Sequence, residues 1–90
     1  MTIGERMKQE LKDRKLRSKN IAALIGLPPN KLSLALNNDR RLSATELLGL
    51  CMAAGIDPAV FFLCDELDGV RARIEYLHSD EDEEAENDGE

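Results

Sequence analysis

Aromatic side chains are scarce in this sequence, whose 90 residues include two Phe, one Tyr and no Trp. A hydrophobic core must therefore come from Leu, Ile, Ala and Met, which suit helices better than sheets. No stretch alternates between apolar and polar residues as a half-buried strand does, and no internal repeat is present. A chain of this length forms at most one domain. The sequence predicts a small all-α domain.

Residues suited to catalysis or metal binding are also few. There is one His, and the two cysteines, Cys51 and Cys64, form no CxxC motif and lie within apolar runs. Each is expected to be a small reduced core residue rather than part of a disulfide or a metal site. The chain has no Gly-rich phosphate loop, no HExxH pair and no nucleophile elbow. We expect no enzymatic activity, no cofactor, no metal and no small-molecule substrate.

Long hydrophobic runs are absent as well. No apolar run approaches the ~20 residues that a membrane span requires, and no signal peptide is evident. A soluble, cytoplasmic protein is expected.

The net charge of −6 conceals a strong asymmetry along the chain. Residues 1–41 carry ten Lys and Arg against four Asp and Glu, a net +6, whereas residues 42–78 carry two against six, a net −4. Residues 79–90 carry eight acidic side chains and no basic one, a net −8. Because binding depends on the local field, the basic first half can bind a polyanion although the whole chain is acidic.

Two helices are expected at about residues 3–15 and 19–25, because apolar residues recur there at helical spacing. Their buried sides comprise Ile3, Met7, Leu11 and Leu16 in the first helix, and Ile21, Ala22, Leu24 and Ile25 in the second. Ser18 is expected to cap the second helix, and Gly26 to end it in a left-handed conformation.

A third helix is expected at about residues 29–36, directly after a sharp corner. Pro28 and Pro29 lack a backbone N–H, so they suit a helix start, with Pro29 at the first helical position. Asn37 and Asn38 then form a turn in which positive φ is tolerated.

A fourth helix has the clearest start signal, a capping box from Ser43 to Glu46 with Leu42 and Leu47 placed as a hydrophobic staple. Its apolar face comprises Leu47, Leu48, Leu50, Cys51 and Ala54, and Gly55 ends it. Asp57 and Pro58 predict the start of a fifth helix. The core anchors expected from it are Val60, Phe61 and Leu63.

Beyond the fifth helix, apolar residues alternate at intervals of four and three residues, interrupted only by Gly69. They are Leu63, Leu67, Val70, Ile74 and Leu77, and they predict a further C-terminal helix. Residues 79–90 are acidic and lack large apolar side chains, so they are expected to be disordered.

The corner between the second and third helices has the spacing of a helix-turn-helix, which Ile21, Ala22, Gly26 and Leu32 define. Ala22 is small enough to let the two helices approach, and Leu32 anchors the second of them. A charged helix precedes these two helices, and a capped helix and the segment Ala-Ala-Gly-Ile-Asp-Pro follow them. This order of helices along the chain resembles the five-helix DNA-binding domain of the phage repressor/Cro family of transcriptional regulators. The resemblance covers about residues 3–63.

The resemblance implies a cytoplasmic repressor from a phage or prophage that binds double-stranded DNA. It implies a DNA-binding domain at 1–63. Beyond that domain, the apolar spacing and the acidic composition predict a packing or dimerisation helix at 64–78 and a disordered acidic tail at 79–90. The start of the third helix would enter the major groove. The base-contact residues implied are Asn30, Lys31, Ser33 and Leu34, and the phosphate-contact residues are Ser18, Lys19, Asn37, Arg40 and Arg41.

Two features depart from the family pattern. Many members pair an Arg in the first helix with a Glu at the end of the recognition helix, and Leu11 and Leu36 take these positions here. Replacing both partners of a buried ion pair by apolar groups is often neutral or stabilising. Pro29 and Leu34 stand where polar base-contacting residues are common in the family, so modest sequence specificity is expected.

Several alternatives stay open from the sequence. The residues Leu67, Val70, Ile74 and Leu77 could form the seam of a homodimer, or the helix could fold back over its own chain. The acidic tail either keeps the chain soluble or competes with DNA for the basic half. We call the helices expected at about residues 19–25 and 29–36, with the corner between them, the bent pair. The competing function is a small helical protein-interaction module, such as an antitoxin or a phage adaptor, that uses the bent pair only for packing.

Overall fold

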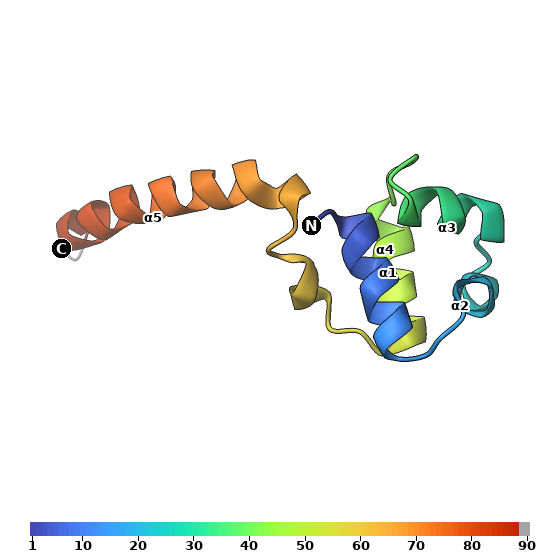
Figure 1. Cartoon of the computed structure of the whole chain (residues 1–90). Coiled ribbons are helices and arrows are strands. Elements are labelled where there is room, and N and C mark those ends of the chain that lie inside the picture. The colour runs from blue at the N-terminus through green and yellow to red at the C-terminus, as the bar shows by residue number, and fades with distance from the viewer. Residues whose placement is uncertain (89–90) are drawn as a thin grey trace.

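The computed structural model describes the backbone of residues 1–88 and the side chains of residues 1–79. Within that part of the chain the structure is helical throughout, with no strand (Figure 1). The elements are α1 (Ile3–Asp13), α2 (Ser18–Leu24), α3 (Pro29–Leu36), α4 (Ala44–Ala54), the 3₁₀ turns η1 (Pro58–Phe61) and η2 (Asp65–Leu67), and α5 (Asp68–Asp88). The prediction of an all-α fold is confirmed.

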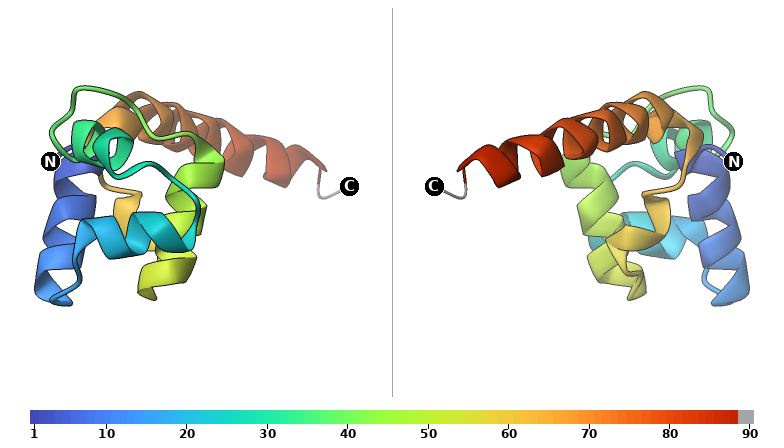
Figure 2. Two further views of the ribbon diagram at one scale, coloured as in Figure 1. Left: turned by 90° about the vertical axis from the view of Figure 1, so that its right-hand side faces the viewer. Right: turned by 90° about the vertical axis from the view of Figure 1, so that its left-hand side faces the viewer.

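The helices α1 to α4 form a body from which α5 extends away (Figure 1). Within the body α3 packs against α1 and α2, and α2 also packs against α4. The views in Figure 2 show α5 projecting beyond the body, and the whole chain measures 54 × 22 × 22 Å. The far end of α5 therefore lies at the opposite end of the molecule from α2 and α3.

The core of the body consists of aliphatic side chains, one Phe and two thiols. Its largest fully buried residues are Met7, Leu32, Leu50 and Phe61. The surrounding buried residues are Leu11, Ile21, Ala22, Leu27, Leu36, Cys51, Ile56 and Cys64. Cys51 and Cys64 are free and buried, as predicted, and burial raises the pKa of both thiols.

Three residues predicted to lie in the core are instead on the surface. Leu24, Leu48 and Leu63 are 71%, 49% and 80% exposed. In α2 the side toward the core is taken by Ile21 and Ala22, which turns Leu24 outward. In α4 the buried residues are Leu50 and Cys51, and Leu48 faces away from them. Leu63 lies between the core residues Phe61 and Cys64 and points outward from them.

Capping residues fix most of the helix boundaries. The predicted capping box of Ser43 and Glu46 begins α4, and a second box, of Thr2 and Glu5, begins α1. The prediction that Ser18 caps α2 is wrong, because Ser18 is the first residue of the helix and Arg17 precedes it without a side-chain cap. The left-handed conformation of Lys15, with φ of 58°, turns the chain after α1, which therefore ends earlier than predicted.

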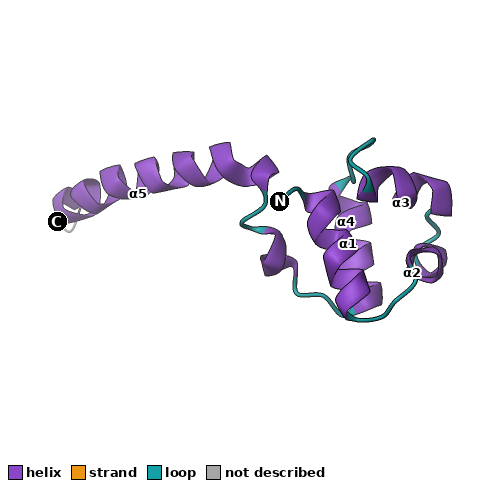
Figure 3. Cartoon of the chain, viewed as in Figure 1, coloured by secondary structure: helices purple, strands orange, loops and turns teal. Residues whose placement is uncertain are grey.

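The predicted fifth helix is only a short 3₁₀ turn, η1, between α4 and α5 (Figure 3). Its Asp57 carboxylate accepts a hydrogen bond from the Ala59 N–H at 3.0 Å. Phe61 anchors this turn in the core, and Val60 is partly buried against it. The turn is short because Phe62 and Leu63 point to solvent, so that only one helical turn has apolar partners. Cys64 is the last residue of the core along the chain.

The predicted C-terminal helix is present as α5, although it begins at Asp68 rather than near Leu63. Gly69 lies in its first turn and does not interrupt it. The helix extends to Asp88, past the boundary predicted at residue 79. Residues 89–90, and the side chains of 80–88, lie outside the described part of the chain, so the disorder expected for 79–90 stays a prediction.

One carboxylate is buried on α1. Glu10 is 7% exposed and accepts a hydrogen bond from Arg6 Nε at 2.8 Å and another from Arg14. Burial raises the pKa of Glu10, but the hydrogen bonds and charges of Arg14 and Arg6 together outweigh it and hold the pKa below its ordinary value of 4.5. The two arginines thus neutralise the charge of this one buried carboxylate.

Replacing Glu10 with Gln is expected to lower the free energy of unfolding by about 1–2 kcal/mol at pH 7. Because the folded-state pKa is lowered, the stabilisation is fully present above the unfolded pKa of 4.5 and is lost as pH falls through the folded pKa. Urea unfolding of both proteins at pH 7 and near pH 3 measures the effect. An equal difference in stability at the two pH values would contradict it.

Candidate nucleic-acid interface

The corner between α2 and α3 is closed by backbone hydrogen bonds around Gly26. The Leu27 N–H donates to the Ala22 carbonyl at 2.9 Å, and the Gly26 N–H donates to the Ala23 carbonyl at 3.2 Å. This is the Schellman pattern of a helix end, and Gly26 takes the left-handed φ of 71° that it requires. Pro29 then begins α3, as predicted. The chain reverses direction within a few residues because each of them suits the turn.

One side of α3 is buried and the other is free. Leu32, Ala35 and Leu36 are 0%, 2% and 9% exposed and face the core. The four residues predicted to contact bases lie outside it, and all are exposed: Asn30, Lys31, Ser33 and Leu34. No other described element covers them. The helix therefore presents one amide, one hydroxyl, one cationic and one apolar side chain to the solvent.

Two contacts that the sequence did not reveal set the position of α3 against α1. A Cβ atom on Gly4 would lie 2.2 Å from the Ala35 carbonyl oxygen, so the two helix backbones touch at this glycine. At the end of α3 the Thr2 hydroxyl donates to Asn38 Oδ1 at 2.7 Å. Asn38 has φ of 66°, in agreement with the predicted turn. These contacts hold the exposed side of α3 in a fixed orientation.

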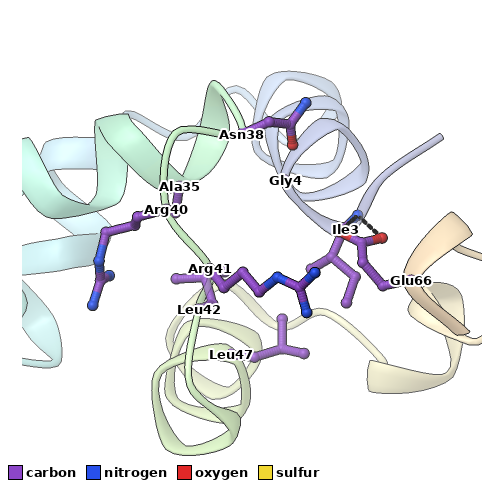
Figure 4. Close-up of a pocket in the computed structure, with 9 residues that line it drawn as sticks. All are labelled: Ile3, Gly4, Ala35, Asn38, Arg40, Arg41, Leu42, Leu47 and Glu66. Atoms are coloured by element: carbon purple, nitrogen blue, oxygen red, sulfur yellow. Dashed lines mark hydrogen bonds between the residues drawn. The ribbon is translucent and has the colours of Figure 1, made fainter.

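The two arginines after α3 have different surroundings. Arg40 donates from both terminal nitrogens to the two carboxylate oxygens of Glu46, each at 3.2 Å. Hydrogen bonds from Ser43 and Arg40 lower the pKa of Glu46. Arg41 leaves the loop on the opposite side, toward Ile3 and Glu66 (Figure 4). Arg40 thus holds the loop to the start of α4, and Arg41 points away from α3.

The remaining predicted contacts lie at the two ends of the bent pair. Ser18 and Lys19 are at the start of α2, where Ser18 is partly buried and Lys19 is exposed, and Asn37 is exposed after α3. Neither Lys19 nor Lys31 forms a salt bridge with any residue whose side chain is described. Both charges are therefore available to an external anion. The far end of the α5 helix lies away from both lysines' helices, α2 and α3 (Figure 1).

The positions of the missing family ion pair are filled by apolar residues. Leu11 and Leu36 are 3% and 9% exposed and belong to the same core cluster. The core therefore contains no unpartnered charge at this point, and no described side chain in the molecule has a buried polar atom without a hydrogen bond.

Metal-ligating clusters and membrane-spanning helices were also sought among the described residues. They contain no group of His, Cys, Asp and Glu side chains that could hold a metal ion. None of their helices is both long and apolar enough to cross a bilayer.

A family model of the Cro/C1-type HTH DNA-binding domain matches residues 6–61. The chain belongs to this family. The match includes both helices of the bent pair and extends through α4 and η1. No curated protein and no solved structure matches the chain significantly. As a Cro/C1-type protein, the chain binds DNA through the helix-turn-helix formed by α2 and α3.

In this Cro/C1-type protein, the contact between Thr2 and Asn38 could have been anticipated from a capping motif in the sequence. Thr2 and Glu5 have the Thr-x-x-Glu spacing of a capping box, which marks the start of α1 and places the Thr2 hydroxyl next to Asn38. Glu66 gave no such signal. It accepts hydrogen bonds from the Ile3 N–H at 2.8 and 3.0 Å, and so joins η2 to the start of α1 from a distance of 63 residues.

Proposed function

We propose that this Cro/C1-type protein is a transcriptional repressor that recognises specific double-stranded DNA with the exposed side of α3. The observation that carries the proposal is the simultaneous exposure of Asn30, Lys31, Ser33 and Leu34 on a helix whose other side is locked into the core. A protein bound in this way excludes others from the same DNA, which is sufficient for repression. It would act in the cytoplasm, on phage or prophage DNA.

The side chains on α3 suit the edges of bases in the major groove. Asn30 can pair with adenine through two hydrogen bonds, Lys31 can donate to guanine, and Leu34 can contact a thymine methyl group. Ser33 can donate or accept. Pro29 offers no donor, so few bases are read directly. We therefore expect modest discrimination between related sites.

Phosphate contacts would come mainly from the ends of the bent pair. Ser18, Lys19 and Asn37 lie there, and helix starts and polar side chains commonly bind the DNA backbone. Arg40 supports the interface by holding the α3–α4 loop against Glu46. Arg41 adds positive charge from the other side of that loop. As a homodimer the protein would present two copies of α3 to a palindromic site.

Reversing one charge on α3 tests the proposal. Lys31→Glu is expected to weaken binding to genomic DNA fragments by roughly 30-fold or more, and to lower the slope of log affinity against log salt by at least about 1. Electrophoretic shifts over a series of salt concentrations measure both quantities. Lys12→Glu is the matched control, because Lys12 is an exposed lysine of α1 that changes the net charge equally. Equal losses in the two variants would refute the role of α3.

A protein-interaction module is the second candidate function, and one surface favours it. Leu24, Ile25, Gly49, Met52 and Ala53 line a shallow apolar depression between α2 and α4, and Met52 is 85% exposed. Such surfaces often mark protein contacts. If this were the sole function, wild-type protein would not shift DNA at any salt concentration.

Removing residues 79–90 is expected to tighten DNA binding by about tenfold at low salt and to steepen its salt dependence. The truncation removes eight acidic charges and changes the net charge from −6 to +2. Substituting the same eight carboxylates with amides keeps the length and should have the same effect. Unchanged affinity in both variants would show that the tail only aids solubility.

A further inference from the structure

The side of α3 that faces directly away from the core carries no charge. Asn30, Ser33 and Leu34 share this side, because residues three and four positions apart lie on one side of a helix, and all three are exposed. Lys31 lies about 100° round the helix axis from Asn30, on the flank of this side. We refer to Asn30, Ser33 and Leu34 as the reading stripe. It comprises one amide, one hydroxyl and one apolar side chain.

Leu34 lies opposite a core residue of the same helix. Two residues along a helix are separated by about 200° round its axis, so Leu34 points outward where Leu32 points into the core. The exposed fractions agree, at 43% for Leu34 and 0% for Leu32. The Leu34 carbonyl accepts a hydrogen bond from the Asp39 N–H at 2.8 Å, which closes the last turn of α3. Leu34 therefore presents its side chain outward from a fixed backbone.

An outward leucine on this helix needs an apolar partner in the DNA groove. Single exposed leucines are common on protein surfaces, but α3 of a helix-turn-helix lies against the edges of bases, where water is displaced. Among the four bases, the apolar group in the major groove is the C5-methyl group of thymine. Opposite a G·C pair, Leu34 would cover the cytosine amino group or a guanine acceptor and leave it without a hydrogen bond, at a cost in affinity.

We infer that the reading stripe recognises A·T base pairs, and that the C5-methyl group opposite Leu34 decides its discrimination between sites. The inference rests on the proposed function. 5-Methylcytosine carries the same methyl group at the same ring position as thymine, so it substitutes for thymine in part, whereas uracil lacks the methyl group and does not. Methylation of a cytosine at C5 opposite Leu34 therefore raises the affinity of the protein for that DNA.

Asn30 lies one helical turn before Leu34 and suits an adenine nearby. An asparagine amide pairs with adenine N6 and N7 through two hydrogen bonds. Four residues of helix span about 6 Å and successive base pairs are about 3.4 Å apart, so Asn30 and Leu34 meet base pairs about two steps apart. Ser33 donates or accepts and imposes no choice of base. Contact with guanine is left to Lys31 on the flank, so the stripe itself favours A·T pairs.

Replacing single bases in one duplex tests the inference. A duplex enriched by the wild type from a random pool is resynthesised with each thymine replaced in turn by uracil. At one or more positions uracil should lower the affinity about fourfold, the effect of one methyl group that is no longer buried. At such a position a C·G pair should bind more weakly still, and methylation of its cytosine at C5 should recover about fourfold. Electrophoretic shifts at one fixed salt concentration measure these affinities.

Two leucine variants separate the methyl contact from other properties of the modified DNA. Leu34→Ala should bind the thymine and uracil duplexes equally, and the cytosine and 5-methylcytosine duplexes equally. Leu48→Ala is the matched control, because Leu48 is 49% exposed but lies on α4, and it should retain the wild-type preferences. Circular dichroism checks that both variants are folded. A preference for the methyl group that persists in Leu34→Ala, or that is lost equally in both variants, overturns the inference.

Failure of the inference differs in its result from failure of the proposed function. A wild type that shifts no duplex at any salt concentration refutes DNA recognition and the methyl contact together. A wild type that shifts duplex DNA, but enriches no sequence or is indifferent to uracil at every position, still binds DNA and overturns the inference alone.

Discussion

Replacing Leu32 with Ala is expected to lower the free energy of unfolding by about 3–4 kcal/mol, which is a large part of the stability of a small domain. Leu32 is 0% exposed and belongs to the core cluster that α1, α2 and α4 share. Removing its side chain leaves a cavity at the meeting point of these helices, and rigid helix packing closes such a cavity only in part. Urea unfolding followed by circular dichroism measures the loss.

Leu34→Ala is the matched control for Leu32→Ala. Both residues are leucines of α3, but Leu34 is 43% exposed and faces away from the core. Its replacement should change stability by less than about 1 kcal/mol. It should affect only the affinity for DNA sites that present a thymine methyl group to α3. Comparable loss of stability in the two variants would mean that α3 does not have the buried and free sides described above.

Local signals allowed much of the fold to be predicted from the sequence. Ser43 and Glu46 act within one helical turn, and Gly26 and Pro29 act on their own backbone, so their neighbours are sufficient to identify their roles. The buried side of a short helix is different. In the seven residues of α2, Leu24 has the same helical spacing from Ile21 as a core residue would have. Packing against α3 and α4, which involves distant residues, decided which side was buried.

The exposed residues of the candidate site could be predicted from the sequence, but the surroundings of its two arginines could not. Exposure of Asn30 and Lys31 follows from the burial of Leu32 on the same helix, which the spacing indicates. The pairing of Arg40 with Glu46 depends on the path of the loop between α3 and α4. The direction of Arg41 depends on the same loop. Nothing in the local sequence of two adjacent arginines indicates that one is paired and the other is directed toward η2.

Gly4→Ala is expected to destabilise the protein by about 2–3 kcal/mol, although the same change in a helix normally stabilises by up to about 1 kcal/mol. The added Cβ would lie 2.2 Å from the Ala35 carbonyl oxygen and 2.8 Å from Asn38 Oδ1. The first of these atoms belongs to the backbone of α3 and cannot rotate away, so α1 and α3 must separate. Because α3 carries the residues proposed to contact bases, affinity for DNA should fall together with stability.

Gly69→Ala separates this steric effect from helix propensity. Gly69 also lies in the first turns of a helix, but a Cβ atom there would meet no atom within 4 Å. The substitution should leave the stability of the body unchanged and slightly increase the helix content of α5. Thermal unfolding and DNA binding of the two variants should therefore change only for Gly4→Ala. A Gly4→Ala protein as stable as the wild type would show that α1 and α3 are not in backbone contact, and that another interaction orients α3.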